Sequence, residues 1–398
     1  MVSPDRTAAM KIVLAMAMTV SLVWIYLLVG RGFFWRAGQR DVANVDSGIP
    51  GLWPPVIAVV PARDEAELIG CTMASLAAQD YRGSFGVILV DDQSRDGTAA
   101  QAVAAAASAG TEGRLSVLSG VAPPPGWTGK LWAVEQGVAA ALGCSPLPRY
   151  LWLCDADIRF APDTLTSLVR RAEAGDLVLA SLMAKLRCSS FAERCLIPAF
   201  IFFFQMLYPF GWVNAPDRSA AAAAGGCMLV RRDALAAAGG IGGIRNALID
   251  DCALGSKLKD QGPVWLGLSD RALSMRRYEH FGDIRRMVAR SAYAQLGYSP
   301  LWLALTVAAM AFVFLSPPLL AIFATGPSRW LGAADWLAMA GAYLPTLRFY
   351  RMPAAWAVGL PLIACVYLAF TIDSAYQHLR GRGGLWKDRV QAISLRGK

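Results

Sequence analysis

The segment YLWLCDAD, residues 150–157, joins five apolar and aromatic residues to two carboxylates that are separated by one residue. An apolar run of this length is typical of a buried strand, so Asp155 and Asp157 are expected just beyond its carboxyl end. Carboxylates at positions i and i+2 there can both reach one hard cation, which would bridge to the diphosphate of a bound nucleotide. A turn is the simpler explanation of an isolated Asp-x-Asp, so the neighbouring segments decide between the two.

Strand-like runs alternate with helical stretches from Pro54 to about Leu268. The other runs cover residues 56–60, 86–92, 115–120 and 177–181. This alternation predicts βαβ units and an α/β fold whose mostly parallel sheet is covered on both faces. Ligands of such sheets bind beyond the carboxyl ends of the strands. Two further acidic segments fall at such ends, Pro61 to Glu65 and Asp91 to Asp92.

The segments ILVDDQSRDGT (88–98) and GWTGKLWAVEQG (126–137) add candidate ligands for a nucleotide. Asp92 is placed to accept a hydrogen bond from the edge of a base. Asp96, Gly97 and Thr98 are interpreted as an ordinary turn and helix cap. Lys130 lies at a glycine-flanked helix start, where a cation and free amide groups suit a phosphate.

The order of these motifs resembles the family-2 glycosyltransferases with the GT-A fold, which has a Rossmann-like, mixed and mostly parallel sheet. The resemblance covers roughly residues 54–290. It rests on PARDE, VDDQSRDGT, the GK loop, DAD, GGCMLVRRDAL at 225–235 and LIDDCALGSKL at 248–258. The layout further resembles the hopene-associated subgroup of hopanoid biosynthesis, through an N-terminal anchor, an apolar insert, MVARSAYAQLGYS at 287–299 and a C-terminal membrane region.

The resemblance implies that the chain binds a nucleotide-diphosphate sugar together with Mg²⁺ or Mn²⁺. The residues that would line the nucleoside pocket are Pro61, Arg63 and Glu65, with Asp92 on the base. Asp157 would be the principal metal ligand, and Asp155 would lie near the ribose or the metal. Gly225 and Gly226 would let the backbone approach the donor sugar or the acceptor.

Asp251 in LIDDCAL matches the catalytic base of the family, and Asp250 takes the place of a glutamate that usually precedes it. A carboxylate at a helix start can take the proton of an acceptor hydroxyl as it attacks the anomeric carbon, and a single base implies inversion. Helix N-capping is the alternative for both residues. Arg286 or Arg290 would meet the diphosphate, or equally would anchor an amphipathic helix at lipid headgroups.

Composition indicates that part of the chain lies in lipid. Hydrophobic residues make up 56% of the 398 residues, charged residues 17%, and the mean hydropathy is +0.41. The net charge of +9 comes from basic residues beside apolar runs, which is typical of anchoring to anionic lipid rather than of nucleic-acid binding. The eight cysteines form no Cys-x-x-Cys pair and there are two histidines, so zinc or iron–sulfur sites are not supported and His280 is interpreted as structural.

The predicted organisation has a membrane segment on each side of the catalytic domain. Its parts are an anchor at 1–40 (crossing at about 12–30), the GT-A domain at 50–295, a transmembrane region at 300–375 (crossings at about 301–322 and 354–372) and a basic tail at 376–398. Two crossings after the domain keep domain and tail on the cytoplasmic side of a multi-pass protein of the inner (plasma) membrane. Residues 330–347 are then expected at the far interface, with a third crossing as the alternative.

The insert at residues 195–216 is apolar and free of charge. Asp155 and Asp157 precede it and Asp250 and Asp251 follow it, so a single crossing would separate groups that must share one active site. An interfacial or re-entrant hairpin is therefore predicted, with a buried pair of core helices as the alternative.

The leading hypothesis is metal-dependent transfer of a single sugar to a lipid hydroxyl, the lipid being by resemblance a hopanoid or another polyisoprenoid. Processive polysaccharide synthesis is the alternative, although residues 285–291 lack the Gln and Trp of the Gln-x-x-Arg-Trp motif of processive members. Two further hypotheses are a non-catalytic membrane scaffold and a nucleotidyltransferase that releases pyrophosphate.

Overall fold

The computed structural model describes residues 4–41, 52–386 and 389–390. The chain divides into two compact units, each described by itself. The sheet unit comprises Gln39–Arg187, Phe210–Arg277 and Gly384–Lys398, and the helical unit comprises Met1–Gly38, Cys188–Pro209 and Tyr278–Gly383. Most of the predicted basic tail beyond Trp386, and the predicted start of the domain at residue 50, lie outside the described residues.

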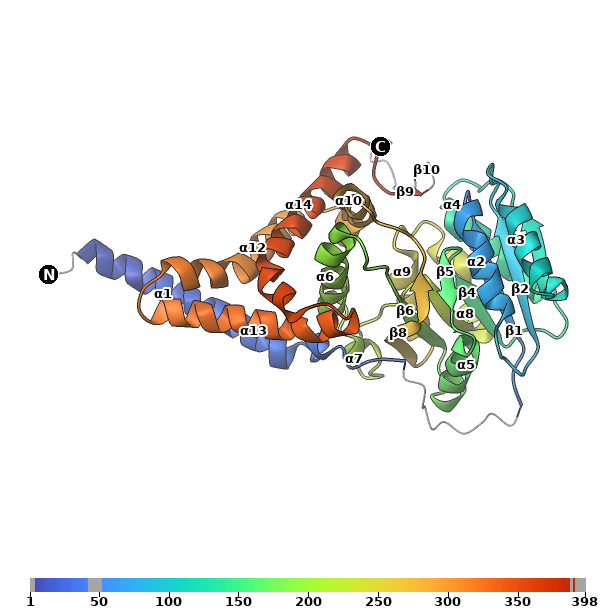
Figure 1. Cartoon of the computed structure of the whole chain (residues 1–398), viewed down its shortest axis with the longest axis horizontal. Coiled ribbons are helices and arrows are strands. Elements are labelled where there is room, and N and C mark those ends of the chain that lie inside the picture. Colours follow the sequence, from blue (N-terminus) through green and yellow to red (C-terminus); the bar gives the residue numbers. More distant parts are fainter. Residues whose placement is uncertain (1–3, 42–51, 387–388, 391–398) are drawn as a thin grey trace. The chain divides into compact units, whose positions relative to one another are not determined.

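An eight-stranded sheet forms the centre of the sheet unit, in the order β3-β2-β1-β4-β7-β6-β8-β5 (Figure 1). The strands are β1 (Val56–Ala62), β2 (Phe85–Asp91), β3 (Leu115–Ser119), β4 (Tyr150–Cys154), β5 (Ile158–Phe160), β6 (Leu179–Lys185), β7 (Cys227–Arg231) and β8 (Val264–Ser274). β1 runs parallel to both β2 and β4, β2 runs parallel to β3, and β6 runs parallel to β8. β7 is antiparallel to both β4 and β6, and β5 is antiparallel to β8. The predicted mixed, mostly parallel sheet is confirmed.

Five strands correspond to the predicted apolar runs, and three do not. β5 has three residues, which are too few to show a period, and β8 is interrupted by Gly267, Asp270 and Arg271. Strand patterns of this kind become recognisable only when their neighbours in the sheet are known.

Helices cover both faces of this sheet. On one face are α2 (Ala66–Ala77), α3 (Thr98–Ser108) and α5 (Thr164–Ala174), and on the other are α4 (Gly129–Leu142) and α9 (Asp250–Lys259). Gly137 lets α4 approach the sheet closely, because a Cβ there would lie 2.4 Å from Cγ1 of Val59 and 2.9 Å from Cγ2 of Val90. The close packing of α4 on the sheet determines the direction in which the side chain of Lys130 points, because Lys130 lies in the first turn of this helix.

Smaller elements complete the sheet unit. They are η3 (Glu112–Arg114), α7 (Phe210–Val213), α8 (Arg232–Ala237), η4 (Ile241–Ile244), β9 (Leu385–Trp386) and β10 (Arg389–Val390). β1, β2 and β4 are parallel and end at the same edge of the sheet, where the antiparallel β7 begins, with Cys154 opposite Cys227. The segments that follow β1, β2 and β4 and the one that precedes β7 therefore meet at this edge.

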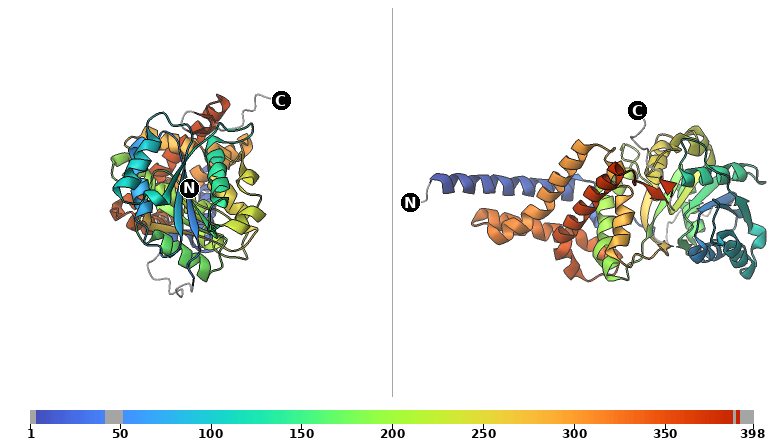
Figure 2. Two further views of the ribbon diagram at one scale, coloured as in Figure 1. Left: turned by 90° about the vertical axis from the view of Figure 1, so that its right-hand side faces the viewer. Right: turned by 90° about the horizontal axis from the view of Figure 1, so that it is seen from above.

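The helical unit contains the long apolar helices. Its elements are α1 (Pro4–Ile25), η1 (Tyr26–Gly30), η2 (Phe34–Arg36), α6 (Phe191–Leu207), α10 (Phe281–Ala289), α11 (Ala292–Gln295), α12 (Pro300–Phe323), α13 (Pro327–Phe349), η5 (Ala354–Gly359) and α14 (Leu360–Leu379). Within the residues that the structure describes, three helical spans are long and apolar enough to cross a membrane: Thr7–Gly30, Pro300–Phe323 and Ala354–Leu379. They contain the three predicted crossings, and residues 330–347 lie within α13. Figure 2 shows α12 and α13 lying side by side as a hairpin.

The apolar insert forms one helix and one short turn. α6 packs against α10, α13 and α14 within the helical unit, and the hydroxyl of Tyr367 donates to the carbonyl of Leu196 at 2.8 Å. α7 has four residues and belongs to the sheet unit. The alternative considered for this insert, a pair of core helices, is therefore not formed, because α6 ends at Leu207 and α7 is too short to return along it. Contact of α6 with lipid stays a prediction.

Candidate active site

The loops after β1 and β2 are joined by hydrogen bonds that form one rigid wall. The amide of Asp64 donates to Oγ of Ser94 at 3.0 Å, and Oδ1 of Asp64 accepts from the amide of Arg95 at 2.8 Å. Oδ1 of Asp96 accepts from the amide of Thr98 at 3.0 Å, which confirms the predicted turn, and α3 begins after Gly97 without a side-chain cap. This wall carries the residues predicted to line the nucleoside pocket.

Arg63 and Asp92 link the ends of β1 and β2. Nη1 of Arg63 donates to the carbonyl of Asp92 at 2.6 Å and lies 3.5 Å from Oδ2 of Asp92, which is completely buried. A buried charge of this kind is tolerated when a partner of opposite sign neutralises it. The structure thus assigns Asp92 a partner inside the protein, and its predicted contact with a base stays a prediction.

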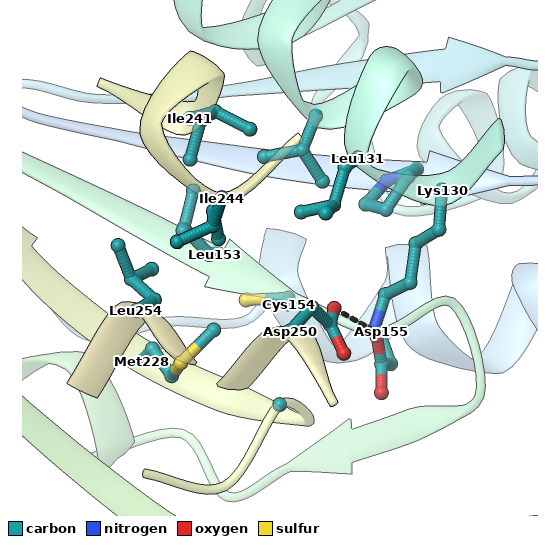
Figure 3. A pocket seen from close by; sticks show the side chains of 13 residues that line it. Lys130, Leu131, Leu153, Cys154, Asp155, Met228, Ile241, Ile244, Asp250 and Leu254 are labelled. Atoms are coloured by element: carbon teal, nitrogen blue, oxygen red, sulfur yellow. Dashed lines mark ion pairs between the residues drawn. The ribbon is translucent and has the colours of Figure 1, made fainter. Parts of the chain in front are cut away.

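Lys130 lies between two carboxylates from different parts of the chain. Its Nζ is 2.9 Å from Oδ1 of Asp155, after β4, and 2.9 Å from Oδ2 of Asp250, at the start of α9 (Figure 3). Burial lowers the pKa of Lys130, but the attraction of the two carboxylates outweighs it and holds the pKa above the ordinary value for lysine. Lys130 therefore stays charged and holds together two residues that the sequence places far apart.

Backbone amide groups hold the carboxylate of Asp251. Oδ2 accepts from the amide of Gly225 at 3.0 Å, and Oδ1 accepts from the amide of Cys252 at 2.8 Å. Burial and the nearby charge of Asp250, opposed by Lys130, raise the pKa of Asp251 to about 6. The N-cap of α9 is Ile249 and no side chain caps this helix, so the capping alternative for Asp250 and Asp251 is not supported.

Arg276 was not predicted from the sequence, and it pairs with two predicted site residues. Just after β8, its Nε lies 2.8 Å from Oδ2 of Asp157 and its Nη2 lies 2.7 Å from Oε1 of Glu65. Burial and the charge of Asp155 raise the pKa of Asp157, although Arg276 opposes this effect. No local sequence signal marks Arg276, because its partners lie in segments far away along the chain.

A small cavity that is open to solvent brings several predicted residues together. Its wall is mostly apolar and comes from α4, η4, α9 and the strands β1, β4 and β7 (Figure 3). The predicted site residues that line it are Pro61, Lys130, Asp155, Gly225 and Asp250. Gly225 lies close to two charged groups, since a Cβ there would be 3.5 Å from both Nζ of Lys130 and Oδ2 of Asp251.

Comparison with known proteins identifies this part of the chain. Residues 57–239 match the family model described as glycosyl transferase family 2. The chain carries a family-2 glycosyltransferase domain. It is also 38% identical over 92 residues to an N-acetylglucosaminyltransferase of Azorhizobium caulinodans, a match that covers 23% of this chain and 22% of that protein. The chain thus spans about a fifth of the length of that relative.

A solved structure supports the fold of the whole chain. The mannosyltransferase of Pyrobaculum calidifontis, in complex with GDP-Man and Mn²⁺, is similar with a TM-score of 0.51 and 19% sequence identity. The similarity covers 94% of this chain and 100% of that one. It confirms the predicted GT-A-like fold, and the hopene-associated subgroup stays a prediction.

The acidic residues of the family-2 domain fit a cation that arrives with a nucleotide. Among the residues that the structure describes, no three His, Cys, Asp or Glu side chains are grouped to hold a metal ion. Mg²⁺ is commonly bound by one or two protein carboxylates and by phosphate oxygens of the substrate. Asp155 and Asp157 can supply the carboxylates, and their cationic neighbours Lys130 and Arg276 compensate their charge in the absence of the nucleotide.

The remaining candidates are divided between the two units. Gly226 lies beside the site, since its carbonyl accepts from the amide of Asp155 at 3.4 Å. Arg286 and Arg290 belong to the helical unit, at and after the end of α10, so their predicted contact with a diphosphate stays a prediction. His280 precedes α10 and its amide donates to Asp283 at 2.9 Å, which agrees with a structural role.

Proposed function

We propose that this protein is a glycosyltransferase of the inner (plasma) membrane that moves one sugar from a nucleotide-diphosphate sugar to a lipid hydroxyl. The observation that carries the proposal is the bridge from Lys130 to Asp155 and Asp250. This bridge joins the first carboxylate of the Asp-x-Asp segment to the start of α9, which carries the candidate base Asp251, beside one cavity.

Asp251 would act as the base. Two backbone amides hold its carboxylate, and its raised pKa of about 6 leaves it ionised at neutral pH while it is still able to accept a proton. As the acceptor oxygen attacks the anomeric carbon, the proton passes to Asp251. The bond from that carbon to the diphosphate oxygen then breaks, its electron pair leaves with the nucleoside diphosphate, and the configuration inverts.

The diphosphate would lie near Asp157. Asp157 and Asp155 would hold Mg²⁺ or Mn²⁺, which would neutralise charge on the leaving diphosphate. Arg276 orients Asp157 and Glu65 by pairing with both, and Lys130 orients Asp155 in the same way. These two cations hold the carboxylates in position before the nucleotide binds.

A lipid acceptor is supported by the three spans long and apolar enough to cross a membrane. An enzyme fixed in the membrane meets lipid hydroxyls more readily than soluble ones, and the resemblance to the hopene-associated subgroup suggests a hopanoid or another polyisoprenoid. The cytoplasm is where nucleotide sugars would reach the domain, in agreement with the basic residues that follow α1.

The test is release of nucleoside diphosphate by the detergent-purified full chain, with bacterial lipid extract, across donors that include those of mannose and N-acetylglucosamine. Mn²⁺-dependent release that Asp157→Ala abolishes would support the proposal. A ladder of long products would indicate processive synthesis, and release of pyrophosphate a nucleotidyltransferase. Failure to bind any nucleotide would leave the non-catalytic scaffold as the better explanation.

A further inference from the structure

Within the helical unit, α1, α12 and α13 pack against one another, and α14 also packs against α12. Nε1 of Trp24 on α1 donates to the carbonyl of Val313 on α12 at 3.0 Å, and its ring meets the edge of Phe314 at 5.7 Å. α13 packs against both α12 and α1, as the views in Figures 1 and 2 agree. A Cβ on Gly332 of α13 would lie 2.8 Å from the carbonyl oxygen of Pro317, so the two backbones are in close contact. Close backbone contact at a small residue is typical of helices packed in lipid.

The outward faces of these three helices are apolar and uncovered within the unit. The exposed fractions are 70% for Ile12 on α1, 76% for Phe323 on α12 and 73% for Leu337 on α13. Side chains of this kind on three adjacent helices form a surface that lipid chains would cover.

α13 has the length and the polarity pattern of a crossing, although its sequence is less apolar than the other spans. Arg329 and Arg348, near its ends, are about 28 Å apart at the rise of an α-helix, close to the thickness of the hydrocarbon core. The one acidic residue between them, Asp335, is buried and accepts from Oγ of Ser21 on α1 at 2.8 Å. A polar pair inside a bundle is the arrangement in which an acidic residue is tolerated in a membrane.

The second half of α14 lies among polar partners instead. Asp373 pairs with Arg285 of α10 at 2.7 Å, and Oγ of Ser374 accepts from the amide of Tyr293 at 3.0 Å. The ring of His378 stacks on Tyr298 with centroids 4.4 Å apart. The apolar part of α14 that remains, residues 360–372, extends for only about 20 Å, and the apolar segment before it, η5, is a short 3-10 helix that packs on α13.

We propose that α1, α12 and α13 are the three membrane crossings and that α14 lies with α6 and α10 at the cytoplasmic interface. This rests on the membrane location in the proposed function, and it replaces the crossing expected at 354–372. α12 leads outward and α13 returns, so the turn after α13 and the basic residues Arg380 and Arg382 stay on the side of the catalytic domain. Arg348 and Arg351 beside that turn agree with a cytoplasmic location.

The two arrangements differ in where residue 351 lies. In the full chain with its native cysteines replaced by serine, Arg351→Cys and Thr325→Cys are each labelled with a membrane-impermeant maleimide, in spheroplasts and in inside-out vesicles. Thr325→Cys, in the turn between α12 and α13, should react in spheroplasts only, which shows that the chain is inserted in its expected orientation. Arg351→Cys should then react in inside-out vesicles only, by at least about tenfold.

Labelling of Arg351→Cys in spheroplasts, with Thr325→Cys also labelled there, would overturn the proposal and make α14 a crossing. Extraction of the chain by alkaline carbonate would overturn the membrane location itself, and that result is distinct from a changed labelling side. Nucleoside-diphosphate release bears on the proposed reaction alone and is unaffected by either result.

Discussion

Buried charge is arranged in two ways in this chain. In the sheet unit, Lys130 and Arg276 each pair with two carboxylates, and all of these groups lie at one edge of the sheet. In the helical unit, the buried acids accept hydrogen bonds from uncharged groups. Glu193 accepts from the backbone amides of Ser189, Ser190 and Tyr278, and Asp335 accepts from the hydroxyl of Ser21.

We propose that this difference separates charge that serves a ligand from charge that serves the fold. A cation shared by two carboxylates could be redistributed if a diphosphate and a metal ion bind at this edge of the sheet. The predictions below test this distinction, from the largest expected effect to the smallest.

Asp251→Asn should reduce the rate of sugar transfer by about a thousandfold, because an amide cannot accept the proton of the acceptor hydroxyl. Nucleotide affinity, measured by calorimetry, should change little, because Asp251 is held by Gly225 and Cys252 and not by the loops after β1 and β2 that carry the predicted nucleoside pocket. The matched control is Asp217→Asn, an exposed acid of the same unit, which should keep full activity. Equal losses of activity in Asp251→Asn and Asp217→Asn would show that Asp251 does not act as the base.

Arg276→Gln should lower activity by about 10- to 100-fold, because Asp157 and Glu65 lose the cation that orients them. The affinity for Mn²⁺ in the presence of nucleoside diphosphate, measured by calorimetry, should fall with it. Arg277→Gln changes the adjacent exposed arginine and should have no effect on either quantity. Unchanged Mn²⁺ affinity in Arg276→Gln would assign Arg276 to the fold instead.

Gly332→Ala should destabilise the helical unit by about 1–3 kcal/mol, since its Cβ would lie 2.5 Å from Cβ of Leu320. Thermal unfolding of the chain in detergent measures the loss. Gly341→Ala on the same helix places its Cβ where nothing lies within 4 Å, so it should leave stability unchanged or raise it slightly. Destabilisation by both substitutions would mean that α13 does not pack closely at Gly332 in particular.

The pH dependence of kcat/KM should follow the ionisation of Asp251. Its pKa is raised to about 6, and a base acts in its ionised form, so the rate should fall to about half near pH 6 and about tenfold by pH 5. Asp250→Asn removes a nearby negative charge and should therefore move the acidic limb of the profile, the fall in kcat/KM near pH 6, to lower pH. A limb that stays in place in Asp250→Asn would show that Asp250 does not influence the base.

Much of the sheet and of the acidic edge could be predicted from the sequence. β1, β2 and β4 are apolar runs that end in polar residues, and parallel strands joined by helices end on the same side of a sheet. Asp155, Asp157 and Asp92 were therefore placed at the correct edge. Arg276 could not be found in this way, because an arginine after an interrupted strand has no local pattern that names its partners.

The long apolar helices show the same limit. Hydropathy identifies α1 and α12, and it favours α14 over α13, since it averages over residues without regard to what each one contacts. The partner of Asp335 and the polar neighbours of α14 become visible only in the folded unit.

The sequence by itself determined the chemical groups of this domain and the strand ends on which they lie, because apolar runs and chain connectivity are local properties. Only the tertiary structure decided that Lys130 joins Asp155 to Asp250, that Arg276 joins Asp157 to Glu65, and that burial raises the pKa of Asp251. Ion pairing and desolvation depend on which elements surround a group, and those elements come from distant parts of the chain.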